Sequence, residues 1–297
     1  MERKLTQEKV TPPKTTAAKT TTAKPATSKP ATEKLLEVKG LTIELKKNRQ
    51  ALVKDISFAL AKGRTLGLIG ESGSGKTLTS KAILRLLNPG LFALQGEIRY
   101  AGRDLLAMPE TGYRPLRGKE LCMIMQNPMT AFAPMTRIGR QITAILAAHL
   151  PIGPKEAYAR APQALQDINL TQPEKIMGSY PHELSGGMLQ RVMIALSLLL
   201  KPRLIADEAT TAVDAVSEEM ILGEFAKIKA QGISLLVITH DFGVAGTLAD
   251  DILVMKDGQI VEGGTVQEIF RRPRHSYTQE LMAAGLLTQG GGNAQSG

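Results

Sequence analysis

The segment GESGSGKT, residues 70–77, follows an apolar run at 65–69 and precedes a helix-like segment at 78–87. Strand, glycine-rich loop and helix in this order are typical of a phosphate-binding loop. The glycines allow successive N–H groups to turn toward phosphate oxygens, and the helix N-terminus adds positive potential at the same point. The alternative is a glycine-rich turn with a chance Lys-Thr pair, which the flanking strand and helix disfavour. We therefore expect the chain to bind a nucleoside triphosphate.

The side chains of this loop have separate expected roles. Lys76 reaches the β- and γ-phosphates as a point charge, and the Thr77 hydroxyl is placed to ligate Mg²⁺. We expect the nucleotide to be bound by the whole loop, which consists of Gly70, Glu71, Ser72, Gly73, Ser74, Gly75, Lys76 and Thr77.

The formal net charge of +9 over 297 residues is unevenly distributed. Residues 1–34 carry eight Lys or Arg against three Asp or Glu, and they are rich in Thr, Ala and Pro. They offer few large apolar side chains to bury, so we expect a disordered, solvated tail rather than a lipid-binding one. The remainder is only slightly basic, which disfavours nucleic acid as a partner.

Three observations favour a cytoplasmic location. The N-terminal tail lacks the apolar segment of a secretory signal. The longest apolar run, residues 192–200, is far shorter than the ~20 residues of a membrane helix. Cys122 is the only cysteine, so we expect neither a disulfide framework nor a cysteine metal cluster.

Strand-like and helix-like segments alternate along most of the chain, which predicts an α/β fold with a mostly parallel sheet covered on both faces. Two strands before the phosphate-binding loop predict an additional β-layer, and from Ile138 the apolar period indicates a helical insertion. The expected strands are 35–45, 52–60, 65–69, 96–100, 120–125, 203–206 and 233–238, followed by a hairpin of 252–255 and 259–261 around a primed Asp257-Gly258 turn. Helices are expected at 78–87, 155–168, 217–230, 266–271 and 277–284. Three more are expected with one bound each: one that begins at 138, one that ends at 200 and one that begins after 241.

The run LIADE, residues 204–208, ends an apolar strand with two carboxylates. In an open α/β sheet, ligands bind at the carboxyl ends of the strands. Asp207 is placed to hold Mg²⁺ opposite Thr77, and Glu208 to polarise the attacking water as a general base. The alternative is a pair of acids that cap the next helix, which the nearby phosphate-binding loop disfavours.

Gln126 and His240 also follow predicted strands. The Gln126 amide is expected to contact Mg²⁺ or water, and His240 to hydrogen-bond the γ-phosphate. A lone histidine at a strand end is often an ordinary polar residue, but the carboxyl edge of the sheet favours a functional one. Together with Glu208, these two residues are the candidate catalytic groups.

The segment LSGGMLQ, residues 184–190, opens a helix and forms a second potential anion site at Ser185, Gly186 and Gly187. One nucleotide does not need two such sites from one chain.

The order and spacing of GESGSGKT, Gln126, LSGGMLQ, LIADE, Asp214 and His240 resemble the ATPase subunits of ABC transporters over residues 35–285. The resemblance implies ATP and Mg²⁺ as cofactors. It also implies a P-loop NTPase (RecA-like) core with an antiparallel β-subdomain and an α-helical subdomain inserted at about 130–192. In this family two ATPase domains pair head to tail, so Ser185, Gly186 and Gly187 would act on the partner's nucleotide. Asp214 would lie at the dimer interface.

The segments MQNPMTAFAP, YPHELSGGMLQRVMIAL and RHSYTQELMAA resemble the nickel/peptide importer branch, most closely its D-type nickel subunit. This implies ATP hydrolysis that energises uptake of nickel or a metal chelate, with an oligopeptide, dipeptide or opine cargo as the alternative. The absence of a cysteine-rich C-terminal tail favours nickel. The implied partners are a paralogous ATPase subunit in a heterodimer, two membrane-spanning permeases and, indirectly, an extracytoplasmic binding protein. The chain would lie peripherally on the cytoplasmic face of the cell membrane.

The sequence departs from the family pattern at two places that bear on the site. Ala209 stands where a proline is usual, and residues 46–50 hold no aromatic side chain to stack on adenine, which leaves Leu52 or Phe58 as substitutes. A soluble ABC ATPase and a small P-loop kinase remain alternatives. The first usually adds a coiled coil or a second ATPase domain, and the second has no use for LSGGMLQ. Residues 286–297 are expected to form a flexible end.

Overall fold

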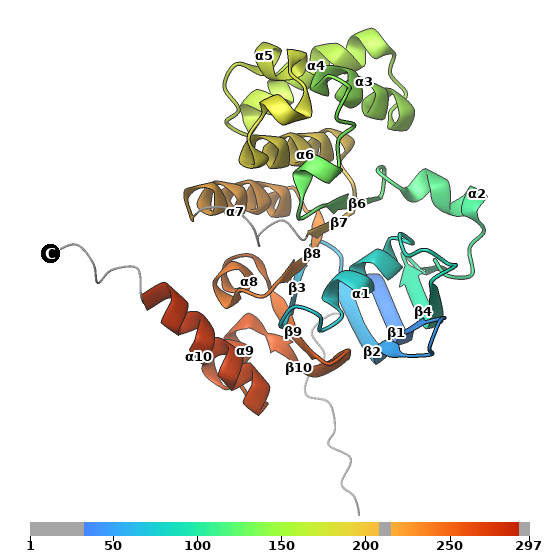
Figure 1. Cartoon of the computed structure of the whole chain (residues 1–297), viewed down its shortest axis with the longest axis vertical. Helices are drawn as coiled ribbons and strands as arrows, with labels where there is room; N and C mark the ends of the chain where they lie inside the picture. The colour runs from blue at the N-terminus through green and yellow to red at the C-terminus, as the bar shows by residue number, and fades with distance from the viewer. Residues whose placement is uncertain (1–32, 208–214, 291–297) are drawn as a thin grey trace, which may run out of the picture. The chain divides into compact units, whose positions relative to one another are not determined.

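The computed structural model describes residues 33–207 and 215–290, without the side chains of 206, 207, 215–218 and 285–290. In this part of the chain, strands and helices alternate around a six-stranded and a four-stranded sheet (Figure 1). The predicted α/β fold is confirmed. The disorder predicted for the N-terminal tail falls on residues 1–32, which lie outside the described residues, whereas Lys34 already belongs to the first strand.

The six-stranded sheet has the order β10-β9-β3-β8-β7-β6, in which only β10 runs antiparallel to its neighbour. On β8, Leu235 and Val237 pack against helices on one face, while Leu236 and Ile238 pack into a separate core on the other. Burial on both faces explains why the sequence of β8 is continuously apolar. The strands are β3 (Thr65–Ile69), β6 (Leu121–Ile124), β7 (Leu204–Asp207), β8 (Ser234–Thr239), β9 (Asp251–Lys256) and β10 (Gln259–Thr265).

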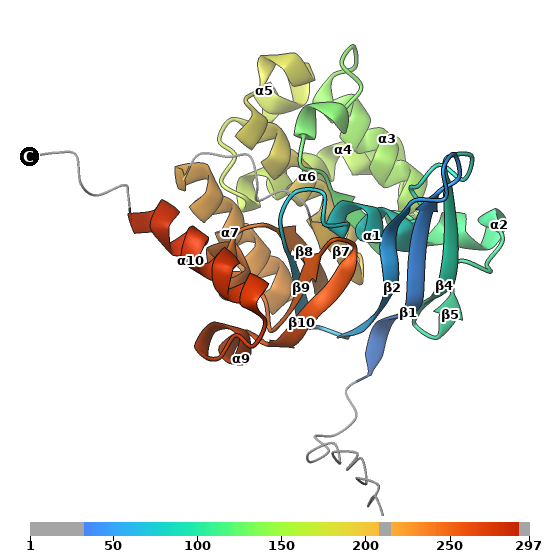
Figure 2. The ribbon, with the colours of Figure 1, turned by 60° about the horizontal axis from the view of Figure 1, so that its bottom comes forward.

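The additional β-layer is an antiparallel sheet of β2 (Ala51–Ala61), β1 (Lys34–Leu45), β4 (Phe92–Tyr100) and the short β5 (Arg103–Asp104). Figure 2 shows β2, β1 and β4 side by side. The start predicted for β4 at Gly96 was wrong by four residues. Gly96 instead lies at an irregularity within the strand, where its φ is 99° and an added Cβ would be 2.5 Å from the Gly40 carbonyl oxygen.

Helix α1 (Lys76–Ile83) packs between the two sheets through Ala82 and Ile83. The predicted helix extended to residue 87, but α1 ends earlier. Arg85 adopts the left-handed conformation, with φ 50°, and the Leu86 N–H donates to the Lys81 carbonyl at 2.8 Å. This is a Schellman termination whose left-handed residue is arginine instead of the usual glycine, so the sequence carries no stop signal there.

The helical insertion follows β6 and its loop. It consists of α3 (Ile138–His149), α4 (Pro154–Asp167), α5 (Pro173–Gly178) and α6 (Gly186–Leu200). Figure 1 shows α3, α4 and α5 together on the side of α6 that faces away from the strands. Pro162 lies inside α4, as expected, whereas the two-turn α5 was not predicted. The short helices α2 (Glu110–Tyr113), η1 (Arg114–Leu116), η2 (Pro128–Thr130) and η3 (Pro181–Glu183) belong to the connections.

The C-terminal part contains α7 (Ala215–Ala230), α8 (Phe242–Leu248), α9 (Val266–Arg271) and α10 (Ser276–Gly290). The hairpin of β9 and β10 turns at Asp257 and Gly258, whose φ angles of 48° and 81° confirm the primed turn. Helix α10 continues to Gly290, beyond the predicted helix end at 284, and residues 291–297 lie outside the description. No helix in the described ranges is long and apolar enough to cross a bilayer.

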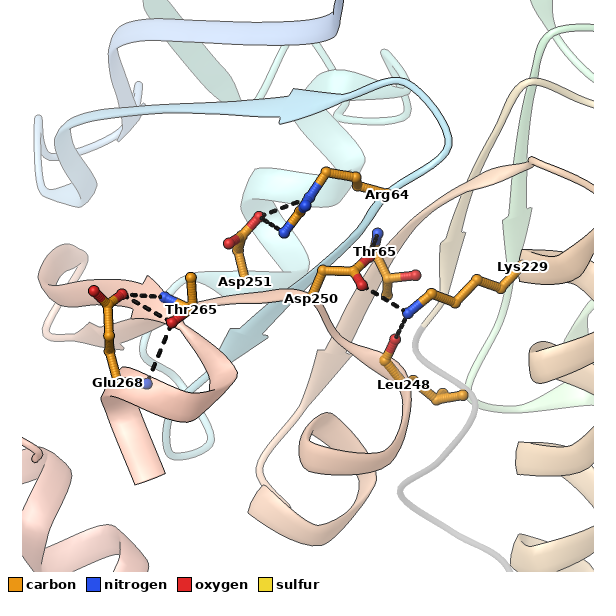
Figure 3. A network of polar contacts seen from close by, with 8 residues as sticks. All are labelled: Arg64, Thr65, Lys229, Leu248, Asp250, Asp251, Thr265 and Glu268. Atoms are coloured by element: carbon orange, nitrogen blue, oxygen red, sulfur yellow. Dashed lines mark hydrogen bonds and ion pairs between the residues drawn. The ribbon is translucent and has the colours of Figure 1, made fainter. Parts of the chain in front are cut away.

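Asp250 joins three elements at the edge of the six-stranded sheet opposite the phosphate-binding loop. Its carboxylate accepts from the Thr65 N–H at 2.8 Å and from Lys229 Nζ of α7 at 2.9 Å (Figure 3). Beside it, Asp251 forms an ion pair with Arg64 at 2.9 Å. These contacts hold β3, β9 and α7 together at the amino ends of the parallel strands. The candidate site lies at the opposite edge, where the parallel strands have their carboxyl ends.

Glu224 of α7 is a buried carboxylate at the junction with the helical insertion. Its Oε1 accepts from Asn169 Nδ2 at 3.3 Å and from Lys227 Nζ at 2.9 Å. Its Oε2 is buried and has no hydrogen-bond partner among the described residues. An unpaired buried oxygen of this kind opposes folding.

We expect Glu224→Met to raise the free energy of unfolding by about 1 kcal/mol, because an apolar side chain of similar size removes the desolvation cost of the carboxylate. Urea denaturation of the purified chain measures the change. Lys227→Met should instead lower the stability, because it removes one of the two partners of the buried carboxylate and leaves the charge less compensated. A less stable Glu224→Met variant would show that the Asn169 and Lys227 contacts outweigh the cost of burial.

Candidate functional site

The phosphate-binding loop lies between β3 and α1, at the carboxyl edge of the parallel strands. At Gly70 the loop passes so close to β9 that an added Cβ would lie 2.2 Å from the Met255 carbonyl oxygen. Gly73 and Gly75 have φ angles of 84° and 105°, in the left-handed region. The loop therefore needs glycine for two reasons, a close backbone approach and a turn that other residues rarely adopt.

The Lys76 side chain is folded back into the loop and is only 8% exposed. Its Nζ donates to the Gly70 carbonyl at 2.6 Å, to the Glu71 carbonyl at 2.7 Å and to Ser74 Oγ at 3.3 Å. These bonds place one positive charge in the concave side of the loop, beside the N-terminus of α1. Both features favour an anion at this point.

Residues distant in sequence brace the loop, and the sequence analysis did not identify them. The Gly258 N–H of the β9–β10 turn donates to the Ser74 carbonyl at 3.1 Å, and the Gly258 carbonyl accepts from the Lys54 N–H at 2.8 Å. From α10, the Tyr277 hydroxyl accepts from the Glu71 N–H at 3.1 Å. No local motif marks these contacts, because each one depends on tertiary packing.

A pocket of about 480 Å³ brings the loop together with two further predicted residues. Gln126 reaches it from the end of β6, and His240 from the end of β8. Both side chains are exposed, as is Thr77. The pocket is lined by Glu71, Ser72, Gly73, Gly75, Lys76, Thr77, Leu78, Gln126, Ile238, Thr239 and His240. Neither Leu52 nor Phe58 belongs to its lining.

Three predicted site residues lie partly or wholly outside the described part of the chain. Asp207 ends β7, where its backbone is in register with Ile124 on β6 and Val237 on β8, but its side chain is not described. Glu208 and Asp214 lie outside the described residues, as does Ala209. The backbone of Asp207 therefore reaches the same sheet edge as Gln126 and His240.

The segment predicted to form a second anion site, residues 185–187, lies elsewhere in the chain. Ser185 caps α6, and its Oγ accepts from the Met188 N–H at 3.2 Å. Ser185 and Gly186 are exposed, and neither they nor Gly187 line the pocket of the phosphate-binding loop. The structure thus brings Gln126 and His240 to the loop but leaves the 185–187 segment separate.

The residues near the loop suit a hard cation that arrives with a phosphate ligand. A hydroxyl from Thr77 and an amide oxygen from Gln126 share the pocket, and oxygen ligands of this kind are those that Mg²⁺ prefers. In the ranges that the structure describes, no group of three or more His, Cys, Asp or Glu side chains is placed to hold a metal ion. The available donors therefore fit a cation that takes its remaining ligands from phosphate and water.

Comparison with known proteins identifies the family. A family model described as ABC transporter matches residues 53–211. The oligopeptide transport ATP-binding protein OppD of Bacillus subtilis (strain 168) is 45% identical over 256 residues, covering 84% of this chain and 71% of OppD. The metal-staphylopine import system ATP-binding protein CntD of Staphylococcus aureus (strain NCTC 8325 / PS 47) is 42% identical over 251 residues, covering 84% of this chain and 92% of CntD.

Solved structures support the fold. A dimeric ATP-binding cassette in a post-hydrolysis state with ADP and Pi matches with a TM-score of 0.68 at 22% identity, covering 78% of this chain and 98% of that one. An ATP-binding subunit of an ABC transporter matches with a TM-score of 0.65 at 27% identity, covering 85% and 99%. The predicted ABC ATPase fold is confirmed. The chain therefore belongs to the ABC transporter family, and it is an ATP hydrolase whose reaction is coupled to transport.

Proposed function

We propose that this chain is the ATP-hydrolysing subunit of an ABC importer that takes up nickel or a metal chelate. The observation that carries the ATPase site is the single pocket shared by Lys76, Gln126 and His240 at the carboxyl edge of the sheet. Import as the direction of transport rests on similarity to relatives that are named for oligopeptide transport, metal-staphylopine import and, at 40% identity, glutathione import.

Within the site, each residue has a proposed role in ATP hydrolysis. The Lys76 ammonium and the N–H groups of the loop hold the phosphates and stabilise the negative charge of the transition state. Glu208 accepts a proton from the attacking water, and His240 hydrogen-bonds the γ-phosphate. Thr77, Gln126 and Asp207 would hold Mg²⁺, which neutralises phosphate charge when bound.

The separate anion site has a proposed use in a head-to-tail pair of ATPase subunits. Ser185 and the N–H groups of Gly186 and Gly187 would bind the γ-phosphate held by the partner subunit. Asp214 would lie between the two nucleotide sites. The exposure of Ser185 and Gly186, together with their separation from this chain's own pocket, supports the arrangement. A paralogous subunit as the partner follows the resemblance to importers with two different ATPases.

The rest of the proposed assembly is a pair of membrane-spanning permeases, on whose cytoplasmic side this chain would sit peripherally. ATP-driven closure of the ATPase pair would move the permeases, and hydrolysis would reset them. A binding protein outside the membrane would deliver the cargo. Oligopeptide is the second candidate cargo, because the oligopeptide relative is 45% identical to this chain.

The cargo is tested on the purified complex of this chain with its permeases in lipid. We expect the binding protein loaded with a nickel chelate to raise ATP turnover several-fold over the empty binding protein. The same complex with Lys76→Met should not respond. Stimulation by a peptide-loaded binding protein alone would assign the second cargo, and no stimulation by either would contradict both cargo assignments.

A further inference from the structure

One N–H group of the phosphate-binding loop is bonded to the far C-terminal part of the chain. The Glu71 N–H donates to the Tyr277 hydroxyl at 3.1 Å, across 206 positions of sequence. The other polar backbone atom of Glu71 points into the loop, since its carbonyl accepts from Lys76 Nζ at 2.7 Å and from the Ser74 N–H at 3.2 Å. The peptide groups of Glu71 are thus held on both sides, by Tyr277 outside the loop and by Lys76 and Ser74 within it.

Tyr277 is itself fixed in position. Tyr277 is only 3% exposed, and Lys256 Nζ lies 4.5 Å from the centre of the tyrosine ring. Its own N–H donates to His275 Nδ1 at 3.2 Å, and the His275 N–H donates to Glu262 of β10 at 3.1 Å. The hydroxyl therefore has little freedom to follow a loop that moves.

The Tyr277 hydroxyl is protonated and uncharged when it accepts the hydrogen bond from the Glu71 N–H. Burial raises the pKa of the hydroxyl above its ordinary value, although the bond from the Glu71 N–H opposes this. At neutral pH the group stays an O–H, whose lone pairs accept the Glu71 N–H without adding a negative charge beside the phosphates.

We propose that Tyr277 is a positioning residue of the ATP site, which sets the conformation of the phosphate-binding loop through the Glu71 N–H. The inference rests on the proposed role of residues 70–77 in binding phosphate. Without the hydroxyl, the Glu71 N–H loses its partner, and the Gly70–Glu71 peptide is free to rotate. The Gly70 carbonyl belongs to the same peptide and accepts from Lys76 Nζ, so it would rotate as well, and the ammonium would no longer be aligned for phosphate.

The test is Tyr277→Phe in the full chain, which keeps the ring and removes only the hydroxyl. We expect the dissociation constant for Mg-ATP to rise by up to about tenfold, as the loss of one partly buried hydrogen bond implies. Deuterium exchange should increase in the peptide that contains residues 70–76 but not in β8. Tyr100→Phe is the matched control, since Tyr100 is 0% exposed on β4 and lies outside the pocket. It should bind ATP as the unmodified chain does.

The outcomes separate this inference from the function on which it rests. Unchanged ATP affinity in Tyr277→Phe, with affinity lost in Lys76→Met, would overturn the role of Tyr277 alone. Normal affinity in both variants would overturn the phosphate-binding role of the loop. Increased exchange spread equally over β3, β8 and β9 would show general loosening of the core, which also contradicts a positioning role.

Discussion

Replacing Lys76 by methionine is expected to lower ATP turnover at this chain's own nucleotide site by roughly a hundredfold or more, because it removes the one side-chain charge on the concave side of the loop. Lys76 is buried and is aligned by two backbone carbonyls and Ser74 Oγ, so it meets the phosphates already oriented. No other Lys or Arg lines the pocket in the part of the chain that the structure describes. Methionine keeps a side chain of similar length, so the neighbouring packing should survive.

Steady-state ATP hydrolysis by the assembled complex and ATP binding by the isolated chain both measure this effect. Lys81→Met is the matched control, because Lys81 lies on the same helix but outside the pocket. It should retain near-normal turnover. Thermal unfolding should be similar for both variants. Unchanged ATP affinity of the isolated Lys76→Met chain would refute the assignment of residues 70–77 as the phosphate site.

The sequence predicted those parts of the site whose signal is local. Residues 70–77 form a loop between a strand and a helix, and Gln126 and His240 each follow a strand, so the parallel order of β6 and β8 was enough to bring them to one edge. The primed turn at Asp257 and Gly258 was likewise encoded by two adjacent residues. The ABC ATPase fold was implied by the family resemblance that the phosphate-binding loop, LSGGMLQ and LIADE carry.

Features that depend on tertiary contacts were missed. Tyr277 and the Gly258 peptide touch the loop only because the β9–β10 hairpin and α10 fold back onto it. The end of α1 was not predicted from the sequence, because Arg85 adopts the left-handed conformation at a position where helices usually have glycine. The strand was predicted to start at Gly96, which lies inside β4. Glycine is common both at bulges and at turns, so the sequence alone does not distinguish the two.

Gly186→Asp is expected to abolish ATP hydrolysis in the complex while leaving the isolated chain folded and able to bind ATP. Gly186 is the first residue of α6, and an added Cβ would meet no atom within 4 Å. A carboxylate at a helix N-terminus is favourable by itself, so the isolated chain should lose no stability. In the proposed head-to-tail pair, however, the same carboxylate would face the partner's γ-phosphate at close range. Repulsion between the carboxylate and the phosphate, in an interface from which water is excluded, would prevent the pair from closing around ATP.

Turnover of the complex should fall roughly a hundredfold or more in Gly186→Asp, while the dissociation constant of the isolated chain for ATP stays unchanged, because Gly186 does not line its own pocket. Gly153→Asp is the matched control. Gly153 caps α4, an added Cβ there also meets nothing within 4 Å, and the new carboxylate again lies at a helix N-terminus. That variant should hydrolyse ATP normally, since α4 has no proposed contact with nucleotide. Loss of ATP binding by the isolated Gly186→Asp chain would place the 185–187 segment at its own nucleotide, and normal turnover by the complex would remove it from the reaction altogether.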